Sequence, residues 1–371
     1  MISFEQALSE VLALADPPLA TEALPLAECA GRVLRADVIA RRDQPPFPAS
    51  AMDGYAMRAA DARPGARLRV VGESAAGHRF TGRVGPGEAV RILTGAPLPE
   101  GADRVVIQED VTREGDDIII GEGLDAGPHV RPAGNDFAAG HRLAAPRRLR
   151  PADLALAAAM DAPRLTVSRR PEVAIIATGD ELVMPGEDPG PDQIIASNSF
   201  GLAAMVEAEG GIARLLPIAP DRPEALAAVL ELAADADLVV TSGGASVGDH
   251  DLVLPVARRL GLETSFYKVA MRPGKPLMAG RLGDARFLGL PGNPVSAMVC
   301  GHLFMRPLLR AMAGLPAAPL PSRRLPLAAP VGPNGPRRHF MRARLEAGPA
   351  GTQVRVFERQ DSALLSVLAE A

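Results

Sequence analysis

The 371-residue sequence predicts a multidomain protein of mixed α/β and β class, whose largest part is an α/β sandwich with a mostly parallel sheet. Two observations lead to this fold class. Residues 171–315 alternate between short apolar runs and longer helical patterns, as chains with parallel sheets do. Residues 66–120 instead contain short β-like runs broken by glycine and proline, which is typical of a small all-β domain. An N-terminal helical and extended segment and a short C-terminal β-domain complete the prediction.

The first helix is predicted at residues 3–15, where apolar residues recur with helical spacing. Ser3 would be its N-cap and Gln6 its third residue, a pair that forms a capping box. The proline-rich residues 41–50 cannot form a regular helix or a central strand. A second helix is predicted at residues 151–160, where a proline is well tolerated in the first turn.

These changes along the chain predict four domains. Residues 1–42 and 137–170 would form one helical and extended domain, into which a β-rich domain of residues 43–136 is inserted. The α/β domain would follow at residues 171–315. A proline-rich run then leads to the C-terminal β-domain, residues 316–371, which is expected to be incomplete.

The elements of the α/β domain can be predicted one by one. Residues 172–178 form a continuous apolar run, which indicates a strand buried on both faces. Gly210 and Gly211 end the helix that follows, and Asp221 and Pro223 open the next one. The remaining elements are expected as strands at 213–219, 237–242 and 286–290 and as helices at 198–209, 223–235 and 294–313.

Composition excludes several classes of protein. No apolar run approaches 18 residues, so no membrane span is expected, and the N-terminus lacks the basic start of a secretory signal. Cys29 and Cys300 lie far apart and are expected to be reduced thiols of a cytoplasmic protein. A net charge of −4 argues against nucleic acid as a partner. The six histidines form no cluster, so any metal is expected to be Mg²⁺, held by carboxylates and a substrate phosphate.

Lysine is rare in this chain, because among 40 basic residues only Lys268 and Lys275 are lysines. Their proximity indicates a compact ammonium charge that a planar guanidinium would not replace. We expect Lys268 on a strand, and Arg272 and Lys275 around a type II turn with proline and glycine at its centre. Three cations at one turn predict a site for a multiply charged anion. Chance placement of the lysines and an ordinary solvated turn are the alternatives.

Three predicted strands end in loops of the same kind, in which glycine is followed by acidic, amide or hydroxyl side chains. In an open parallel sheet such loops meet beyond the carboxyl ends of the strands and form a ligand cleft, although one loop alone is often only a turn. Backbone amides there would bind phosphate, and Glu181 and Asp251 could hold Mg²⁺ between phosphate oxygens. The predicted binding residues are Gly179 and Asp180 in the first loop, Ser242, Gly243, Gly244 and Gly248 in the second, and Pro291 and Asn293 in the third.

Four motifs, ATGDEL, SGGASVGDHD, RPGKP and GLPGNPVSA, resemble in order and spacing the molybdopterin-binding domain of molybdopterin molybdotransferases. This is the bacterial MoeA family, to which the E domain of gephyrin also belongs. The stretches PPFPASAMDGYAM, RILTGAPLPEGADRVVIQED and RPAGNDF are similar to other motifs of the family. The resemblance spans roughly residues 1–368 and is highly specific, because several independent motifs occur together.

The resemblance implies an activity, a metal and partners. The family inserts molybdate into adenylylated molybdopterin and releases AMP in a Mg²⁺-dependent step. It works as a homodimer, in which the N-terminal half of one chain faces the α/β cleft of the other. Contact with the upstream adenylyltransferase and with downstream chaperones of molybdoenzymes is implied as well. The alternatives are a non-catalytic, peptide-binding scaffold of the gephyrin type, or an adenylyltransferase-like enzyme on the same α/β domain, which would lack the N-terminal half present here.

Matching motifs also imply the roles of single residues. The implied positions are the catalytic Asp53, Thr94, Asp136, Glu181 and Asp221, the metal ligands Glu181 and Asp251, and Ser197, Asn198 and Ser296 near the expected molybdate pocket. Asp53 and Thr94 could instead form or cap a turn, and Asp221 is an equally good N-cap. Ala196 stands where many relatives carry aspartate, so a ribose or metal contact there is expected to be absent.

Overall fold

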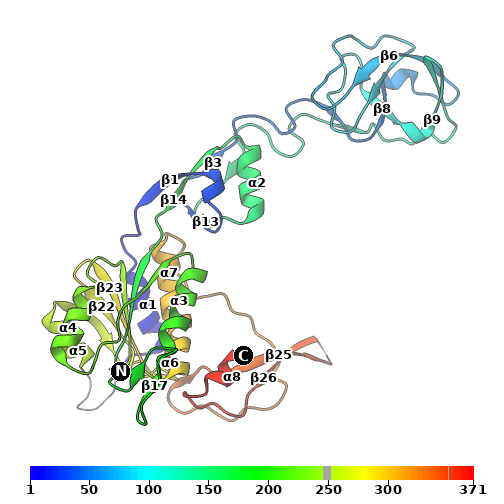
Figure 1. Cartoon of the computed structure of the whole chain (residues 1–371). Helices are drawn as coiled ribbons and strands as arrows, with labels where there is room; N and C mark the ends of the chain where they lie inside the picture. The colour runs from blue at the N-terminus through cyan, green and yellow to red at the C-terminus, as the bar shows by residue number, and fades with distance from the viewer. Residues whose placement is uncertain (245–251, 350) are drawn as a thin grey trace.

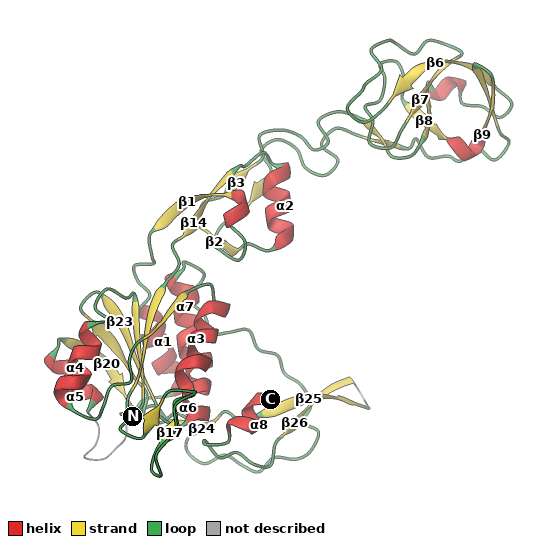
Figure 2. Cartoon of the chain, viewed as in Figure 1, coloured by secondary structure: helices red, strands yellow, loops and turns green. Residues whose placement is uncertain are grey.

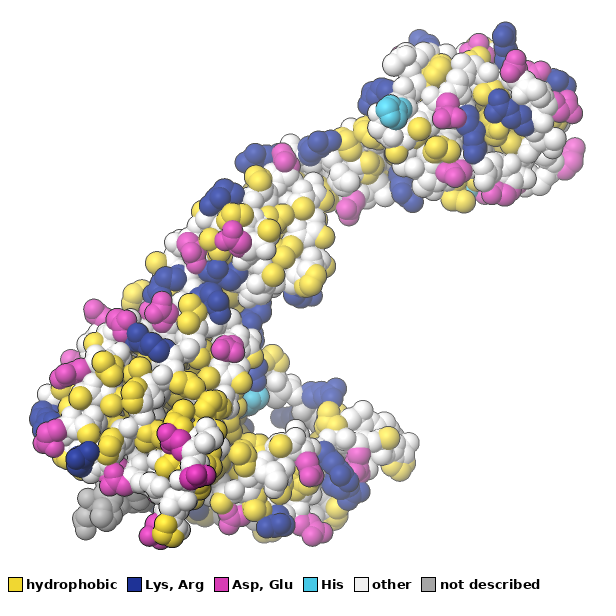
Figure 3. Space-filling view, in the orientation of Figure 1, with side chains coloured by type: hydrophobic (Ala, Val, Ile, Leu, Met, Phe, Trp, Pro, Cys, Tyr) yellow, Lys and Arg dark blue, Asp and Glu magenta, His cyan; other side chains and the backbone are white. Residues whose placement is uncertain are grey.

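A computed structural model describes residues 1–244, 252–349 and 351–371. Figure 1 shows an elongated chain of three compact units, with a C-terminal hairpin that projects from the largest of them. From the lower left to the upper right of the figure these are the α/β unit, the middle unit and the outer β unit. The space-filling view shows narrow connections between them (Figure 3). Among the described residues, no helix is both long enough and apolar enough to cross a membrane.

The outer β unit, residues 49–131, is built on one six-stranded sheet. Its strands are, in spatial order, β8 (Arg104–Ile107), β5 (Gly54–Met57), β7 (Glu88–Ile92), β6 (Arg67–Ser74), β10 (Asp117–Ile120) and β9 (Val111–Glu114). β6 and β7 pair in parallel and the other neighbours are antiparallel. Ile118 and Ile120 on one face of β10 are buried, as the period of a strand with one covered face requires. The β-like runs predicted between residues 66 and 120 therefore form strands of this sheet.

The middle unit combines residues 21–40 with residues 142–168. Its sheet contains, in spatial order, β1 (Thr21–Pro25), β14 (Arg164–Ser168), β2 (Val33–Leu34) and β13 (Arg147–Arg148). The unit also contains a separate strand pair, β3 (Val38–Ile39) with β12 (Arg142–Leu143), and helix α2 (Pro151–Ala159). Asp153, the third residue of α2, accepts a hydrogen bond from the backbone N–H of Arg150 at 2.9 Å, which fixes the predicted start of this helix. Two chain segments, 41–48 and 132–141, connect this unit to the outer β unit.

The α/β unit contains a second six-stranded sheet. Its spatial order is β18 (Ile212–Leu215), β15 (Glu172–Ala177), β19 (Leu238–Ser242), β23 (Ala285–Leu290), β22 (Met278–Leu282) and β20 (Leu262–Tyr267). The first four strands are parallel, and β22 and β20 continue the sheet antiparallel. The sheet is thus mixed, with its parallel part where the sequence predicted it. β18 is shorter than the strand predicted at 213–219.

Both faces of this sheet are covered by helices (Figure 2). Val173 and Ile175 of β15 face one core, and the alternating Ala174 and Ile176 face the other, so the apolar run of this strand is buried on both sides. The first core is covered by α1 (Phe4–Ala13), α3 (Asn198–Ala208), α6 (Pro294–Cys300) and α7 (Arg306–Met312), and the second by α4 (Pro223–Glu231) and α5 (Val253–Arg259).

Two helices differ from the prediction. α1 packs in the α/β unit, where Phe4 meets Phe304 edge-on at 5.4 Å between ring centroids, rather than with the rest of residues 1–42. Its capping box is half formed, because the Ser3 hydroxyl accepts from the Gln6 N–H at 3.1 Å while the Gln6 side chain bonds to Glu10. The helix expected at 294–313 is interrupted by a π-helical segment, Gly301–Met305, since the proline that follows lacks an amide hydrogen.

The C-terminal segment, residues 316–371, forms a hairpin and a short helix. Its elements are β24 (Arg338–His339), β25 (Ala343–Gly348), β26 (Gly351–Val356) and α8 (Leu365–Ala369). β24 pairs in parallel with β21 (Met271–Arg272) of the α/β unit, and α8 contacts α6. This segment therefore lies against the α/β unit through backbone pairing as well as side chains.

One buried carboxylate joins the middle unit to the α/β unit. The Glu209 side chain, at the end of α3, is 3% exposed and pairs with Arg148 of β13 at 2.9 Å and with Arg306 of α7 at 2.7 Å. Arg148 also donates to the backbone carbonyls of Ala208 and Glu209. Because cations stabilise the carbonyl end of a helix, these contacts fasten β13 to the end of α3.

Candidate active site

A cavity of about 430 Å³ lies where the parallel strands β15, β19 and β23 end. Ten of the predicted site residues line it, and these are Gly179, Glu181, Ser197, Asn198, Asp221, Ser242, Gly243, Gly244, Pro291 and Asn293. The strand-end loops therefore meet at one edge of the sheet, as the topology of open parallel sheets predicts. Gly248 and Asp251, the other predicted members of the second loop, lie outside the described residues.

The first loop needs glycine at position 179. Gly179 has a φ of 147°, and a Cβ there would overlap the carboxylate of Glu181. Glu181 thus folds back over the glycine at the mouth of the cavity. Asp180 points elsewhere, because its Oδ1 accepts a hydrogen bond from the backbone N–H of Asp221 at 3.0 Å. This bond ties the first loop to the start of α4.

Asp221 does not act as the helix cap that was its alternative role. Arg222 occupies the N-cap position of α4, and no side-chain hydrogen bond caps that helix among the described residues. The exposed side chain of Asp221 instead borders the cavity. Asp221 is therefore free to face a ligand there.

Asn198 fastens the second and third loops to each other. Its Nδ2 donates to the Ser242 hydroxyl at 2.9 Å and to the carbonyl of Gly292 at 2.7 Å. The glycines allow the loops to approach, since a Cβ on Gly243 would overlap the backbone of Thr178. Asn198 is also the first residue of α3, whose leading N–H groups face the cavity side and carry the positive end of the helix dipole.

Two buried polar atoms at this cavity lack a hydrogen-bond partner within the described ranges: the hydroxyl oxygen of Thr178 and Oδ1 of Asn198. Buried polar atoms are normally paired, so unpaired ones mark places where a ligand or another chain segment completes the site. Ser296, expected near molybdate, lies on α6, is 4% exposed and is not part of the cavity lining. Ser296, which the family motif implied near molybdate, is therefore buried and does not line this cavity.

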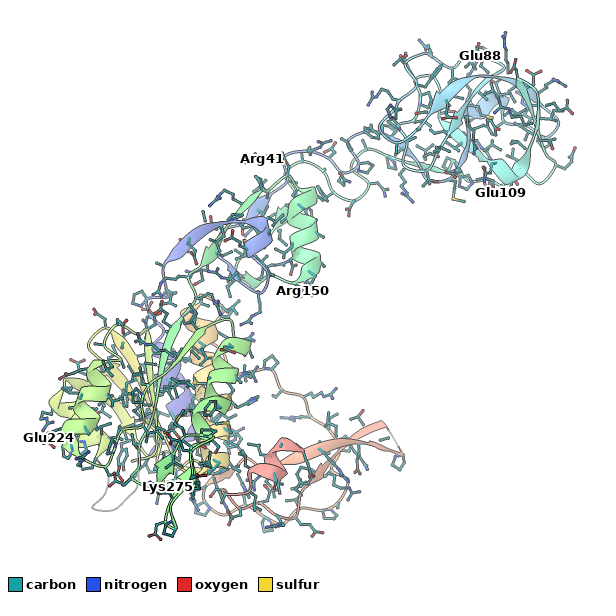
Figure 4. All side chains as sticks on the ribbon, in the orientation of Figure 1. Arg41, Glu88, Glu109, Arg150, Glu224 and Lys275 are labelled. Carbon is teal, nitrogen blue, oxygen red and sulfur yellow. The ribbon has the colours of Figure 1, made fainter. Side chains whose placement is uncertain are left out.

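None of the three predicted cations lines the cavity, although Pro276, which follows Lys275 in the sequence, does. Lys268 follows the end of β20 with a φ of 77°, one residue beyond the strand on which it was expected, and its Nζ lies 4.7 Å from the Tyr267 ring centroid. The backbone N–H of Val269 donates to the carbonyl of Lys275 at 3.0 Å, so both lysines lie on paired segments. Figure 4 shows Lys275 at the end of the α/β unit where β17 (Ile194–Ile195) lies.

The turn that carries these cations differs from the predicted type II turn. Gly274 has the positive φ, 100°, that such a turn requires. The carbonyl of Arg272, however, accepts from the N–H of Phe340 at 2.8 Å, because Arg272 belongs to β21 and pairs with β24. The C-terminal segment thus takes the bond that would have closed the turn.

The sequence analysis did not predict that basic residues of the C-terminal segment, residues 316–371, lie near Arg272. Arg342 is 3% exposed, and its Nε and Nη1 are buried without a partner among the described residues. His339 lies beside Arg272, and its pKa is lowered first by burial and then by the positive charges of Arg272, Arg342 and Arg337. A cluster of cations with unpaired donors attracts anions. The run RRHFMR at 337–342 was the available signal, since it holds three arginines and a histidine.

The C-terminal segment also reaches the third loop. Asn293 Nδ2 donates to the Ser362 hydroxyl at 3.0 Å, and the N–H of Val295 donates to the Ser362 carbonyl at 3.0 Å. Ser362 therefore anchors the segment to the start of α6, beside the cavity. Nothing in its local sequence distinguishes this serine, so only the fold places it.

The remaining predicted residues lie in the other units. Asp53 and Thr94 are adjacent in the outer β unit, where Oδ1 of Asp53 accepts from both the N–H and the hydroxyl of Thr94 at 2.7 Å each. The pKa of Asp53 is lowered, chiefly by the backbone bond from Thr94 and then by its hydroxyl. Asp136 lies in the connection to the middle unit, where its N–H donates to the carbonyl of Gln44 at 2.9 Å. Figure 1 shows this outer unit far from the α/β unit of the same chain.

Among the described residues, no group of three or more histidine, cysteine, aspartate or glutamate side chains is arranged to hold a metal. Glu181 and Asp221 border the cavity, and the second predicted ligand, Asp251, lies outside the described residues. One or two carboxylates suffice for Mg²⁺ when phosphate and water supply its other ligands.

Comparison with known proteins agrees with the motifs across the chain. Residues 2–160 match the family described as MoeA N-terminal region (domain I and II), and residues 174–311 match the probable molybdopterin binding domain. The molybdopterin molybdenumtransferase of Synechococcus elongatus is 38% identical over 386 aligned positions, covering 100% of this chain and 94% of the relative. That of Nostoc sp. is 40% identical over 305 positions, covering 80% of this chain and 70% of the relative.

A solved structure gives the same result for the fold. The molybdopterin biosynthesis MoeA protein from Pyrococcus horikoshii matches with a TM-score of 0.82 at 28% identity, covering 100% of this chain and 93% of that one. The agreement extends over the outer, middle and α/β units, since both chains are covered almost completely. With both halves matched by family, sequence and structure, the chain belongs to the MoeA family of molybdopterin molybdenumtransferases.

Proposed function

We propose that this protein inserts molybdate into adenylylated molybdopterin and releases AMP, giving the molybdenum cofactor. The observation that carries the proposal is the cavity at the strand ends, where residues of all three glycine loops meet. The substrates are anions, namely a phosphoanhydride, a phosphate ester and a tetrahedral oxyanion. A site that offers backbone amides on one side and arginine and lysine on the other suits all three.

The cavity supports binding of the nucleotide-linked phosphates. The leading N–H groups of α3 and the glycine backbone of the second and third loops supply donors without side chains in the way. Asn198 holds these loops in one arrangement before a ligand arrives. Such preorganised donors favour the charge that grows on AMP as it departs.

The cation cluster supports binding of the oxyanion. It comprises Arg272, Arg337 and Arg342, whose positive charges all act on His339, and the C-terminal segment contributes two of these arginines. Arg342 is the main candidate, since its buried guanidinium offers unpaired donors in the described part of the chain. A tetrahedral oxyanion would satisfy them, and a planar guanidinium can donate two parallel bonds to such a group.

Magnesium is part of the proposal. Glu181, with Asp221 nearby on the cavity wall, would hold it together with phosphate oxygens and water. When bound, Mg²⁺ would neutralise the phosphate oxygens and ease departure of AMP. The carboxylates of the chain would orient the ion, and Asp180 would keep the first loop and α4 in register.

We further propose a homodimer in which Asp53, Thr94 and Asp136 of one chain complete the cavity of the other. The distance between outer and α/β units within a chain motivates this arrangement (Figure 1), and a two-fold dimer would present each composite site twice. The adenylyltransferase that makes the substrate and the chaperones that receive the product are proposed as transient partners.

The decisive experiment is incubation of the purified protein with adenylylated molybdopterin, Mg²⁺ and molybdate. We expect AMP and molybdenum cofactor to appear together, and neither to form at the same rate with Glu181→Ala. A protein that binds the substrate but leaves it intact would contradict the proposal and favour a scaffold function.

A further inference from the structure

A small apolar flap borders the cavity. β16 (Leu182–Val183) and β17 (Ile194–Ile195) pair in parallel. The N–H of Ile194 donates to the Glu181 carbonyl at 2.7 Å, and the N–H of Ala196 donates to the Val183 carbonyl at 2.8 Å. These bonds fix the backbone of the flap beside the first strand-end loop.

The flap exposes large side chains at the cavity. Ile194 is 58% exposed and Ile195 is 39% exposed, and both line the cavity together with Leu182. Single exposed apolar side chains are ordinary. Ile194 and Ile195 are the large exposed side chains of a lining that also contains Leu182, alanines and prolines, and covering them with a ligand would remove apolar area from water.

The chemistry of these side chains points to a flat ligand. β-branched side chains have few rotamers, so they form a stiff surface that loses little entropy when it is covered. The residue that follows, Ala196, is 4% exposed and has no polar group to offer a heterocycle. The side chains of the flap can therefore contact the face of a ring but form no hydrogen bond to its edge.

We infer that the apolar edge of the cavity that contains Ile194 and Ile195 packs against a planar heterocycle of the substrate and contributes to its affinity. The inference rests on the proposed function, in which the substrate carries two such rings, adenine and pterin. Its phosphates would lie at the glycine loops and its ring would lie on the flap.

The test uses Ile194→Ser and Ile195→Ser in the full-length protein, with Ile212→Ser as matched control. Ile212 is 42% exposed on β18, outside the cavity lining. Affinities for AMP and for molybdopterin are measured separately by calorimetry. We expect the flap variants to weaken binding of one or both about tenfold, as the loss of roughly 50–60 Å² of apolar contact would do. Ile194→Val should stay within about threefold of the wild type, and the control should not change.

The two affinity measurements show which ring of the substrate contacts the flap. Weaker AMP binding identifies adenine, and weaker molybdopterin binding identifies the pterin. Unchanged affinity for both overturns the inference, and so does a wild type that binds neither. A change in molar mass by light scattering in the flap variants would also overturn it, since the isoleucines would then be covered by a second subunit. A wild type that binds AMP but does not turn over would contradict the proposed function and leave the inference standing.

Discussion

Thr94 donates two hydrogen bonds to a single oxygen of Asp53, one from its N–H and one from its hydroxyl, each 2.7 Å long. The pair joins the loop before β5 to the loop after β7 in the outer β unit. Both bonds favour the ionised carboxylate, and the nearby Arg91 adds to this. The turn role and the active-site role of Asp53 are therefore compatible, because the same bonds that fix the loop keep the carboxylate charged.

Thr94→Val should raise the pKa of Asp53, since it removes the hydroxyl bond and leaves the backbone bond. The pKa of Asp53 in the folded wild type is lowered, so its stabilising effect is present above the unfolded pKa and is lost as pH falls through the folded pKa. In the variant that loss should be smaller and should be complete at a higher pH, because its folded pKa lies closer to the unfolded one. NMR titration of the Asp53 carboxyl carbon measures the shift, and Thr94→Ser, which retains a hydroxyl, should titrate like the wild type.

Mixing Asp53→Ala chains with Glu181→Ala chains should restore activity if the active site is shared between subunits. Each variant alone should be inactive, while a heterodimer would contain one site with both carboxylates. Random exchange gives about half heterodimers, each with one good site, so about a quarter of wild-type activity should return. Absence of recovery after exchange has been verified by mass spectrometry would show that the site lies within one chain.

Lys275→Arg should impair use of limiting molybdate about tenfold, or roughly 1.4 kcal/mol, although it preserves the charge. The reason is geometric, because the guanidinium is larger and donates in a fixed plane. Lys268→Arg is the matched comparison, since Lys268 lies over the Tyr267 ring, and it should have the smaller effect. Equal turnover of Lys275→Arg and the wild type at limiting molybdate would mean that the lysine pair is accidental.

The strand-end loops could be predicted from sequence because their signals are local. A buried parallel strand followed by glycine identifies its own end, and topology then brings the ends together. The same reasoning placed Ser242 at the cavity, and the family resemblance placed Asn198 near the expected molybdate pocket. The two side chains are hydrogen-bonded at 2.9 Å. Burial on both faces of β15 was likewise visible as an uninterrupted apolar run.

Features that depend on distant partners could not be predicted. The amphipathic pattern of helix α1 predicts that one of its faces is buried, but it does not predict against which part of the chain. That face packs in the core of the α/β unit, whose residues are distant in the sequence. The type II turn at Arg272 was a sound local inference, but the Phe340 N–H competes for the carbonyl that would close it. Arg342 has no strand-end glycine near it, so its role beside Arg272 emerges only from the pairing of β21 with β24.

Glu209→Gln should destabilise the protein by about 3 kcal/mol, because it leaves Arg148 and Arg306 without the buried carboxylate that they share. Arg310→Met is the matched control. Arg310 lies 4.0 Å from the same carboxylate and is 36% exposed, so its loss should change the unfolding free energy by less than about 1 kcal/mol. Urea unfolding followed by circular dichroism tests both. Equal stability of Glu209→Gln and the wild type would show that the junction depends on other contacts.

Arg342→Met should abolish stabilisation of the folded protein by tetrahedral oxyanions. An anion that binds only the folded state, present at 100 times its Kd, raises the free energy of unfolding by about 2.7 kcal/mol. We therefore expect molybdate, and tungstate as its structural analogue, to raise the Tm of the wild type but not that of the variant. Without anion the variant loses the hydrogen bond from Nη2 to the Asp361 carbonyl at 2.9 Å but no longer buries the unpaired Nε and Nη1, so its stability should change by less than about 1.5 kcal/mol. Arg344→Met is the control, since Arg344 is 55% exposed two residues away, with its carboxylate partner Glu346 at 4.0 Å, and it should keep the full anion response. An undiminished Tm shift in Arg342→Met would place the oxyanion elsewhere, and Lys275→Arg in the same assay would show whether Lys275 binds it instead.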